Sequence, residues 1–194
     1  GCWVLSSTSV WIVGHDGAGT GRAWHWDGLT WTLSTNQPYG NWNGIAAATA
    51  SDIFVVSYVA GARGLWHYDG SVWTNDATEP SDSQESIFPD PTNPGEMYIH
   101  SDAGGGYSRL RSGVLGNWNL EHSNAYTHSA DRGRSLWVDE VGKVWGCGSD
   151  GGANAVVRSW DSSQLVTEHT IVATAFTGIY GRNQSSILVT GLAS

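Results

Sequence analysis

Eight side chains in this sequence carry groups that proteins use to bind polar ligands. These eight residues lie in segments whose sequences are not repeated elsewhere in the chain. Aromatic rings stack on the CH faces of sugars, while amide, carboxylate and guanidinium groups bond to hydroxyls. Variable polar and aromatic segments are typical of binding loops on a rigid frame. The candidate ligand-binding residues are Tyr39, Trp42, Glu121, Asn124, Tyr126, His128, Asp131 and Arg132.

Catalysis has less support than binding. Hydrolysis of a glycoside needs two carboxyl groups that face each other across the scissile bond. Glu121 and Asp131 flank the longest insertion, but nothing in the sequence fixes their distance. Motifs of zinc, nucleophile and phosphate sites are absent from the sequence. Asp16, Asp102 and Asp150 lie in glycine-rich segments that indicate turns rather than calcium sites. We expect no catalytic residues, no metal and no cofactor.

The composition argues against several partners. The formal net charge is −9, and Lys143 is the only lysine. Nucleic acids and anionic membranes attract clusters of Lys and Arg, so we expect no nucleic acid as a partner. The sequence has no run of about 18 apolar residues, and therefore predicts no membrane span.

Internal repeats carry the fold prediction. Residues 1–4 (Gly-Cys-Trp-Val) align without a gap with residues 44–47 (Gly-Ile-Ala-Ala), at an offset of 43. Trp-His-Trp-Asp-Gly at 24–28 matches Trp-His-Tyr-Asp-Gly at 66–70. Further copies of the first segment begin at 86, 135 and 178. The predicted repeats cover 1–43, 44–85, 86–134, 135–177 and 178–194, of which the last is incomplete.

Each repeat predicts four short strands, here lettered A to D. Strand B is rich in Val, Ile and aromatic residues, as in 10–14. Strand C ends at the Trp-His-Trp-Asp segment, and strand D carries Trp31, Trp73 or Trp118. Asp-Gly pairs at 27–28 and 69–70 stand between strands C and D, where they predict tight hairpin turns.

One four-stranded antiparallel meander per period of about 43 residues is typical of a β-propeller blade. We therefore predict an all-β protein, a single β-propeller domain over residues 1–194 with four full blades and half of a fifth. The apolar strand, the aromatic-Val-Gly strand and the aromatic-Asp-Gly-x-x-Trp hairpin resemble propeller repeats of bacterial and viral proteins. Those repeats are distantly similar to Asp-box (BNR) and photosystem-assembly-factor-like repeats. The resemblance concerns the fold and implies no particular activity.

Residues that recur at one repeat position are predicted to be structural. Trp31 and Trp73 are expected to anchor strand D, since a thin blade gains most by burying an aromatic ring. Cys2 aligns with Ile45 and Cys147 with Val56, so both cysteines are expected to be free, packed thiols. The predicted bulky packing residues of strand B are Trp11, Phe54, Tyr98, Trp145 and Leu188.

The strand order predicts where a site would lie. B–C turns and D-to-A links should emerge on one face of the propeller, and A–B and C–D turns on the other. The D-to-A links are predicted to be the long, variable loops. We expect a ligand to bind on the face that carries them, because the eight candidate residues lie in these links. The four predicted D-to-A links span 33–43, 74–85, 119–134 and 168–177.

The sequence thus favours a non-enzymatic recognition propeller of lectin or adhesin type, which binds a glycan or a protein. It would belong to an extracellular, cell-surface or virion protein. A purely architectural propeller is the alternative, and a sialidase-like or other glycoside hydrolase is third. Strand B of the fifth repeat has no strand C beside it. Because open strand edges recruit other strands, we expect a further segment or a partner chain to cover this edge.

Overall fold

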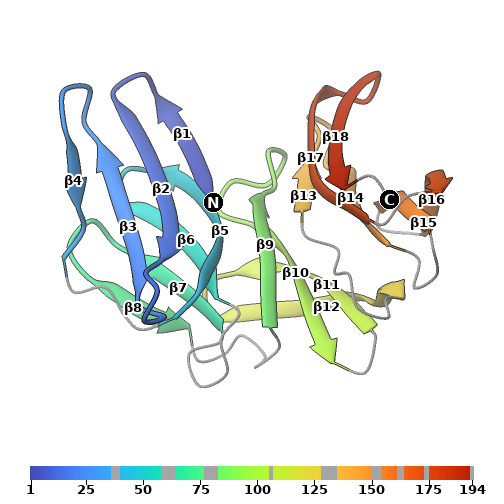
Figure 1. The fold of residues 1–194 in the computed structure, drawn as a ribbon, viewed down its shortest axis with the longest axis horizontal. Helices are drawn as coiled ribbons and strands as arrows, with labels where there is room; N and C mark the ends of the chain where they lie inside the picture. The colour runs from blue at the N-terminus through green and yellow to red at the C-terminus, as the bar shows by residue number, and fades with distance from the viewer. Residues whose placement is uncertain are drawn as a thin grey trace. The chain divides into compact units, whose positions relative to one another are not determined.

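Every regular element in the described part of the chain is a β-strand (Figure 1). The computed structural model describes residues 1–35, 40–57, 64–76, 83–104, 107–127, 135–149, 154–160, 164–172 and 175–192. Four sheets have four strands in sequence order, and a fifth has two. This is the arrangement that four full repeats and half of a fifth predict.

The first sheet comprises β1 (Cys2–Ser6), β2 (Ser9–His15), β3 (Gly21–Trp26) and β4 (Trp31–Leu33). The second comprises β5 (Trp42–Thr49), β6 (Asp52–Ser57), β7 (Gly64–Tyr68) and β8 (Trp73–Asp76). The third comprises β9 (Ser83–Pro89), β10 (Met97–Gly104), β11 (Tyr107–Val114) and β12 (Asn117–Thr127). The fourth comprises β13 (Ser135–Val138), β14 (Val144–Ser149), β15 (Asn154–Trp160) and β16 (Leu165–Val172). The last two strands are β17 (Ala175–Asn183) and β18 (Ser186–Leu192).

The predicted Asp-Gly turns join strands C and D in the first two sheets. Gly28 and Gly70 have φ of +98° and +96°, a conformation that side chains with a Cβ rarely adopt. In the first turn the Asp27 carboxylate accepts the N–H groups of Leu29 and Thr30, both at 2.8 Å. These bonds are the largest causes that hold the pKa of Asp27 below its ordinary value. The turn prediction is confirmed.

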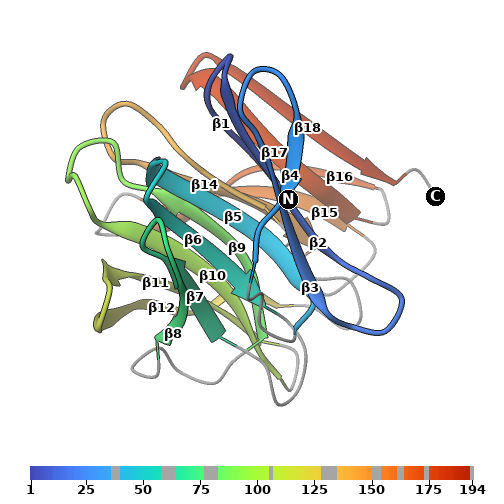
Figure 2. The same cartoon turned by 90° about the vertical axis from the view of Figure 1, so that its left-hand side faces the viewer.

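Residues 1–87 together with 115–117 form one compact unit. In this unit the first sheet packs on the second, as Figures 1 and 2 show for β1 to β8. Side chains alternate along the strands, so Trp3 and Leu5 of β1 join Trp11 and Val13 of β2 in the shared core. That core also holds Ala23, Trp42, Ile45, Ala47, Ile53, Val55 and Trp73.

Residues 88–114 with 118–194 form a second compact unit. Leu110 of β11 packs with side chains of the fourth sheet, among them Leu136 and Val156. On the other side of the fourth sheet, Trp137 and Trp145 pack with Ile179 of β17. Gly181 of β17 lies directly against the Trp137 ring, so a Cβ there would collide with it. Each core therefore forms where two sheets face each other.

Several predicted loops are strands. The links predicted over 33–43, 74–85, 119–134 and 168–177 are shorter, because the flanking strands continue into them. Trp42 already belongs to β5, where it pairs with Ser57. At the other end of a link, β16 runs on to Val172, which pairs with Asn154. A long neighbouring strand offers backbone N–H and C=O groups as hydrogen-bond partners, so the flanking strand continues along it before the chain turns.

Three burial predictions are wrong. Cys2 is exposed, Trp31 is 43% exposed and Leu188 is 66% exposed. Each lies on the face of its sheet that no described sheet of its own unit covers. The prediction holds where a second sheet is present, since Cys147 has no exposed surface and Trp73 is 8% exposed. Both cysteines are free, as predicted.

Candidate ligand-binding cleft

A cleft of about 310 Å³ lies between the first and second sheets. Its size is at the lower end for small-molecule sites, which suits a single sugar ring or one amino-acid side chain. Strands β2, β3, β4 and the segment after β4 supply one wall, and the other comes from Tyr68 and the turns at Ala50 and Gly70. The lining residues are Trp11, His25, Thr32, Leu33, Ser34, Thr35, Ala50, Tyr68 and Gly70.

Aromatic rings form the inner wall of the cleft. Trp11 pairs with His25 across β2 and β3, and the two rings stack with centroids 4.5 Å apart and an interplanar angle of 24°. Tyr68 of the second sheet leans on Trp11 with centroids 5.7 Å apart. Packing among neighbouring rings restricts their orientations, which lowers the conformational entropy that a ligand would have to remove on binding.

Polar groups stand beside the rings. Trp11 is 4% exposed, and its indole N–H has no hydrogen-bond partner among the described residues. A buried donor without a partner costs about 1–3 kcal/mol, so this N–H is an unusual feature of a ring that lines the cleft. The indole N–H groups of Trp42 and Trp66 also lack partners in the described part of the chain, but neither ring lines the cleft.

Hydroxyl groups complete the lining. Thr32 and Thr35 are exposed and present hydroxyls at the outer wall. The Tyr68 hydroxyl donates to the Gly70 carbonyl at 2.9 Å, which leaves its oxygen with acceptor capacity. Ser34 accepts the Trp73 indole N–H at 3.1 Å, and this bond joins the two sheets beside the cleft. Aromatic faces with hydroxyl donors and acceptors are suited to a sugar ring.

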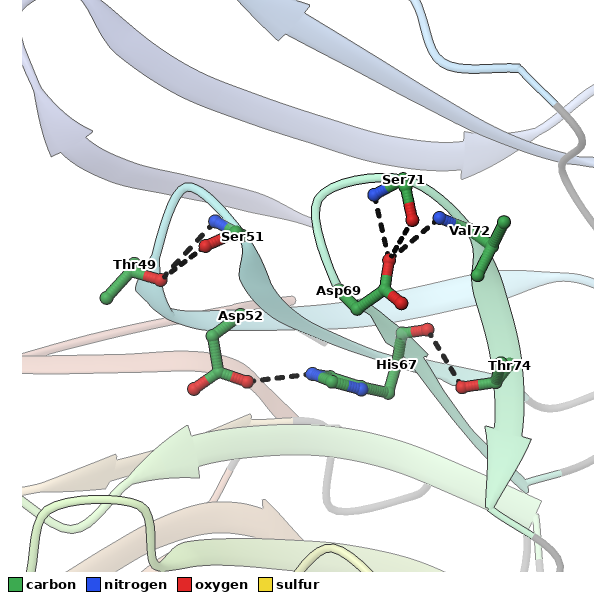
Figure 3. A network of polar contacts seen from close by, with 8 residues as sticks. All are labelled: Thr49, Ser51, Asp52, His67, Asp69, Ser71, Val72 and Thr74. Carbon is green, nitrogen blue, oxygen red and sulfur yellow. Dashed lines mark hydrogen bonds and ion pairs between the residues drawn. The ribbon is translucent and has the colours of Figure 1, made fainter.

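A related polar network stabilises the turns of the second sheet (Figure 3). His67 Nε2 lies 2.8 Å from Asp52 Oδ1, which ties strand C to strand B. Above this pair, the Asp69 carboxylate accepts bonds from the Ser71 N–H, the Ser71 hydroxyl and the Val72 N–H. Those bonds lower the pKa of Asp69 to about 2.

The first sheet repeats this tie with one change. His25 Nε2 lies 3.1 Å from the hydroxyl of Ser9, which occupies the repeat position of Asp52. The ring stack recurs as well, since Phe54 and His67 lie 4.7 Å apart. Because the His tie occurs in both sheets, it is a structural device. His25 has no carboxylate beside it in this tie, and no Asp or Glu is among the described residues that line the cleft.

The predicted ligand-binding residues that the structure describes are not among the residues that line the cleft. Trp42 is 1% exposed, and its ring packs on the backbone of β3 at Gly21, where a Cβ would come within 2.5 Å of it. Glu121 lies in β12 and accepts the Ser112 hydroxyl at 2.6 Å. Asn124 and Tyr126 also lie in β12, which is described there only by its backbone. Tyr39, His128, Asp131 and Arg132 lie outside the described residues.

Trp11 occupies a bulky packing position that recurs as Phe54 and Trp145, and His25 recurs as His67 in the second repeat, so repeat alignment predicts structural roles for both. That inference is correct for their packing but gives no information on the cleft that two sheets create between them. One signal was present in the sequence, since Ser9 replaces the Asp that the second repeat places beside its histidine. The departure marks the first sheet as different at this point.

Two further observations concern the described residues alone. No group of three or more His, Cys, Asp or Glu side chains among them could hold a metal ion. The part of the chain that the structure describes contains no apolar helix of membrane-spanning length. Asp16, predicted to be a turn residue, accepts the N–H groups of Ala18 and Thr20 and pairs with Arg22 at 2.6 Å. Its turn role is confirmed.

No protein-family model and no curated protein matches the sequence. Solved structures match in fold. The SapL1 lectin in complex with alpha methyl fucoside is 15% identical, with a TM-score of 0.67 over 94% of this chain and 68% of that one. YCF48 bound to D1 peptide is 16% identical, with a TM-score of 0.61 over 94% of this chain and 56% of that one. The GH74 enzyme of Niastella koreensis is 15% identical, with a TM-score of 0.63 over 84% of this chain and 28% of that one.

These similarities are at the level of the fold. The matched structures are β-propellers, and the chain is an all-β propeller of four-stranded blades, as the repeats predict. The chain spans little more than half of the YCF48 chain and about a quarter of the GH74 enzyme. A fold shared by a lectin, a peptide-binding protein and an enzyme does not choose among these functions.

Proposed function

We propose that this propeller is a non-enzymatic recognition protein that binds one sugar unit of a glycan in the cleft between its first two blades. The observation that carries the proposal is the Trp11 ring. It forms the inner wall, it is held by His25 and Tyr68, and its N–H has no partner among the described residues. A sugar would stack a CH face on the aromatic wall and bond its hydroxyls to the threonine hydroxyls at the outer wall.

A hydrolytic function has less support in this cleft. Glycosidases need two carboxyl groups about 5–10 Å apart, and none of the described lining residues carries one. We therefore expect binding without turnover, and incubation with nitrophenyl glycosides should release no nitrophenol. Steady release that scales with protein concentration would instead favour the glycosidase alternative.

A glycan array identifies the sugar, and calorimetry with the methyl glycoside of the best sugar gives its dissociation constant. Thr32→Val keeps the shape of the side chain and removes one hydroxyl of the cleft. One hydrogen bond contributes about 1 kcal/mol, so this change should weaken binding about fivefold. Thr74→Val is the matched control, because Thr74 is exposed at the same repeat position of the second blade and lies outside the cleft.

His25→Ala and His67→Ala form a second matched pair. Both remove a ring that stacks on an aromatic neighbour, at 4.5 Å and 4.7 Å respectively, so they should cost similar stability. Only His25 lines the cleft. Loss of sugar binding in the His25 variant alone would support the cleft, whereas equal losses in both would show a general effect on the fold.

The predicted site on the loop-rich face remains a separate proposal that the same assay tests. If Tyr126→Ala and His128→Ala abolish binding while Thr32→Val does not change it, the ligand binds at that face and the cleft is not the site. If no glycan binds the folded protein at all, the architectural alternative gains support and the lectin proposal fails.

A further inference from the structure

One face of the first blade carries apolar side chains that remain in solvent. The exposed fractions are 64% for Val4, 42% for Ile12, 41% for Trp24 and 43% for Trp31. The strand register places these side chains on one side of the sheet. Ile12 lies opposite Cys2 on one neighbouring strand and opposite Trp24 on the other, and Trp31 lies opposite Trp26. A contiguous apolar patch of this kind marks a binding surface. We call it the open face; its members are Cys2, Val4, Val10, Ile12, Trp24, Trp26 and Trp31.

The repeat shows what kind of surface covers such a face. Each member of the open face has a counterpart in the second blade, at an offset of 43 in strands A and B and of 42 in strands C and D. All seven counterparts lie in the core that the second blade shares with the first. They are Ile45, Ala47, Ile53, Val55, Trp66, Tyr68 and Trp73. The open face is therefore a repeat copy of a face that another blade covers.

The covering surface is known in equal detail. On the first blade it includes Trp3, Leu5, Trp11 and Val13, which pack on the second blade. Their counterparts in the fifth repeat, at an offset of 177, are Tyr180, Arg182, Leu188 and Thr190. All four are exposed, Tyr180 at 64% and Leu188 at 66%. Their neighbours Ile179, Ile187 and Val189 point the other way, into the core with the fourth blade.

We propose that the open face binds the β17–β18 sheet of a second copy of this chain, through Tyr180 and Leu188. The contact would repeat the packing of the first blade on the second, with Tyr180 in place of Trp3 and Leu188 in place of Trp11. Because the two surfaces differ, the contact is heterologous and copies add head to tail. Arg182 and Thr190 replace Leu5 and Val13, and two strands replace four, so the association is weaker than the packing inside the chain and depends on concentration.

Sedimentation velocity over a wide concentration range tests the proposal on the full chain. The wild-type chain should form dimers and longer species as its concentration rises. Val4→Glu and Leu188→Glu should each raise the dissociation constant at least about tenfold, since an unpaired charge in a packed interface is strongly unfavourable. Val141→Glu is the matched control, because Val141 is 65% exposed and belongs to neither surface. Circular dichroism confirms that each variant is folded, which is expected because these side chains are exposed in the single chain.

A mixing experiment identifies the geometry. Val4→Glu spoils the open face and keeps the β17–β18 face, while Leu188→Glu does the reverse. An equal mixture of the two should form a dimer that neither variant forms alone. Cys2 gives an independent signal, because alkylation of its thiol should slow as wild-type copies associate and should stay fast in Val4→Glu.

Three results would overturn the proposal. The first is a wild-type chain that stays monomeric at every concentration, which would leave the open face to another segment or partner. The second is association that Val4→Glu does not weaken. The third is a Leu188→Glu variant that still dimerises, because two open faces would then pair with each other.

Discussion

Replacement of Trp73 by Ala should destabilise the protein far more than the same change at Trp31, although both residues occupy the same repeat position. Trp73 is 8% exposed, lies 4.8 Å from Trp42 and 5.0 Å from Tyr68 between ring centroids, and donates to Ser34. Trp31 is 43% exposed, and its ring lies 5.7 Å from that of Trp26 between centroids. The difference arises because the first sheet covers the face of the second sheet that carries Trp73, whereas no described sheet of the same unit covers the face that carries Trp31.

The magnitudes follow from burial. A buried Trp removes about 150–250 Å² from water, which at about 25 cal/mol per Å² corresponds to about 4–6 kcal/mol for the whole side chain. Alanine keeps a small part of this, so Trp73→Ala should lower the free energy of unfolding by about 3–5 kcal/mol. Trp31→Ala loses about half the area and leaves no enclosed cavity, so we expect about 1–2 kcal/mol.

Urea denaturation followed by tryptophan fluorescence and circular dichroism measures both variants. The protein concentration should be low enough that copies do not associate, because association would add burial at Trp31. Trp73→Phe, which keeps an aromatic ring, should recover more than half of the loss. Equal shifts of the midpoint for Trp73→Ala and Trp31→Ala would refute the reasoning, because the two faces would then be equally covered in the single chain.

Two further outcomes are expected. Alkylation of the native protein should modify Cys2 and spare Cys147 until denaturant is added, because Cys147 has no exposed surface and burial raises its pKa to about 12. Mass spectrometry measures which thiol is modified. Modification of both thiols at similar rates would contradict this prediction. The Asp69 pKa is depressed from 3.8 to about 2, so its stabilisation is complete above pH 3.8 and is lost as the pH falls toward 2. The melting temperature of Asp69→Asn should therefore lie below that of the wild type at pH 5 and approach it near pH 2; a gap that does not change with pH would show that the charge on Asp69 is not involved.

The strands and turns could be predicted from the sequence because they depend on interactions between residues close together in the chain. Asp27-Gly28 and Asp69-Gly70 predict hairpins because Gly accepts positive φ and the Asp carboxylate bonds the N–H groups that follow it. The period of about 43 residues predicts one four-stranded sheet per repeat, and each repeat has one. Strand ends were less predictable. Trp42 belongs to β5 because Ser57 of β6 lies beside it and pairs with it. A sequence pattern read over a few residues does not show a pairing partner this far along the chain.

The candidate cleft could not be predicted in the same way. Trp11 and Tyr68 belong to different repeats, and they meet because two sheets pack face to face. Repeat alignment places Trp11 among the predicted packing residues of strand B, and by that criterion it is not a candidate ligand-binding group. The Trp11 N–H has no partner among the described residues, and this depends on how its neighbours pack, which a sequence pattern does not contain.

The sequence by itself determined the alternation of side chains, the positions of the turns and the number of sheets, because these depend on contacts within one repeat. Only the tertiary structure decided which face of each sheet is covered. Cys2 and Ile45 occupy one repeat position, yet Cys2 is exposed and Ile45 is 4% exposed. The hydrophobic effect acts on surface that a facing sheet removes from water, so the same residue position is an open surface in one repeat and core in the next.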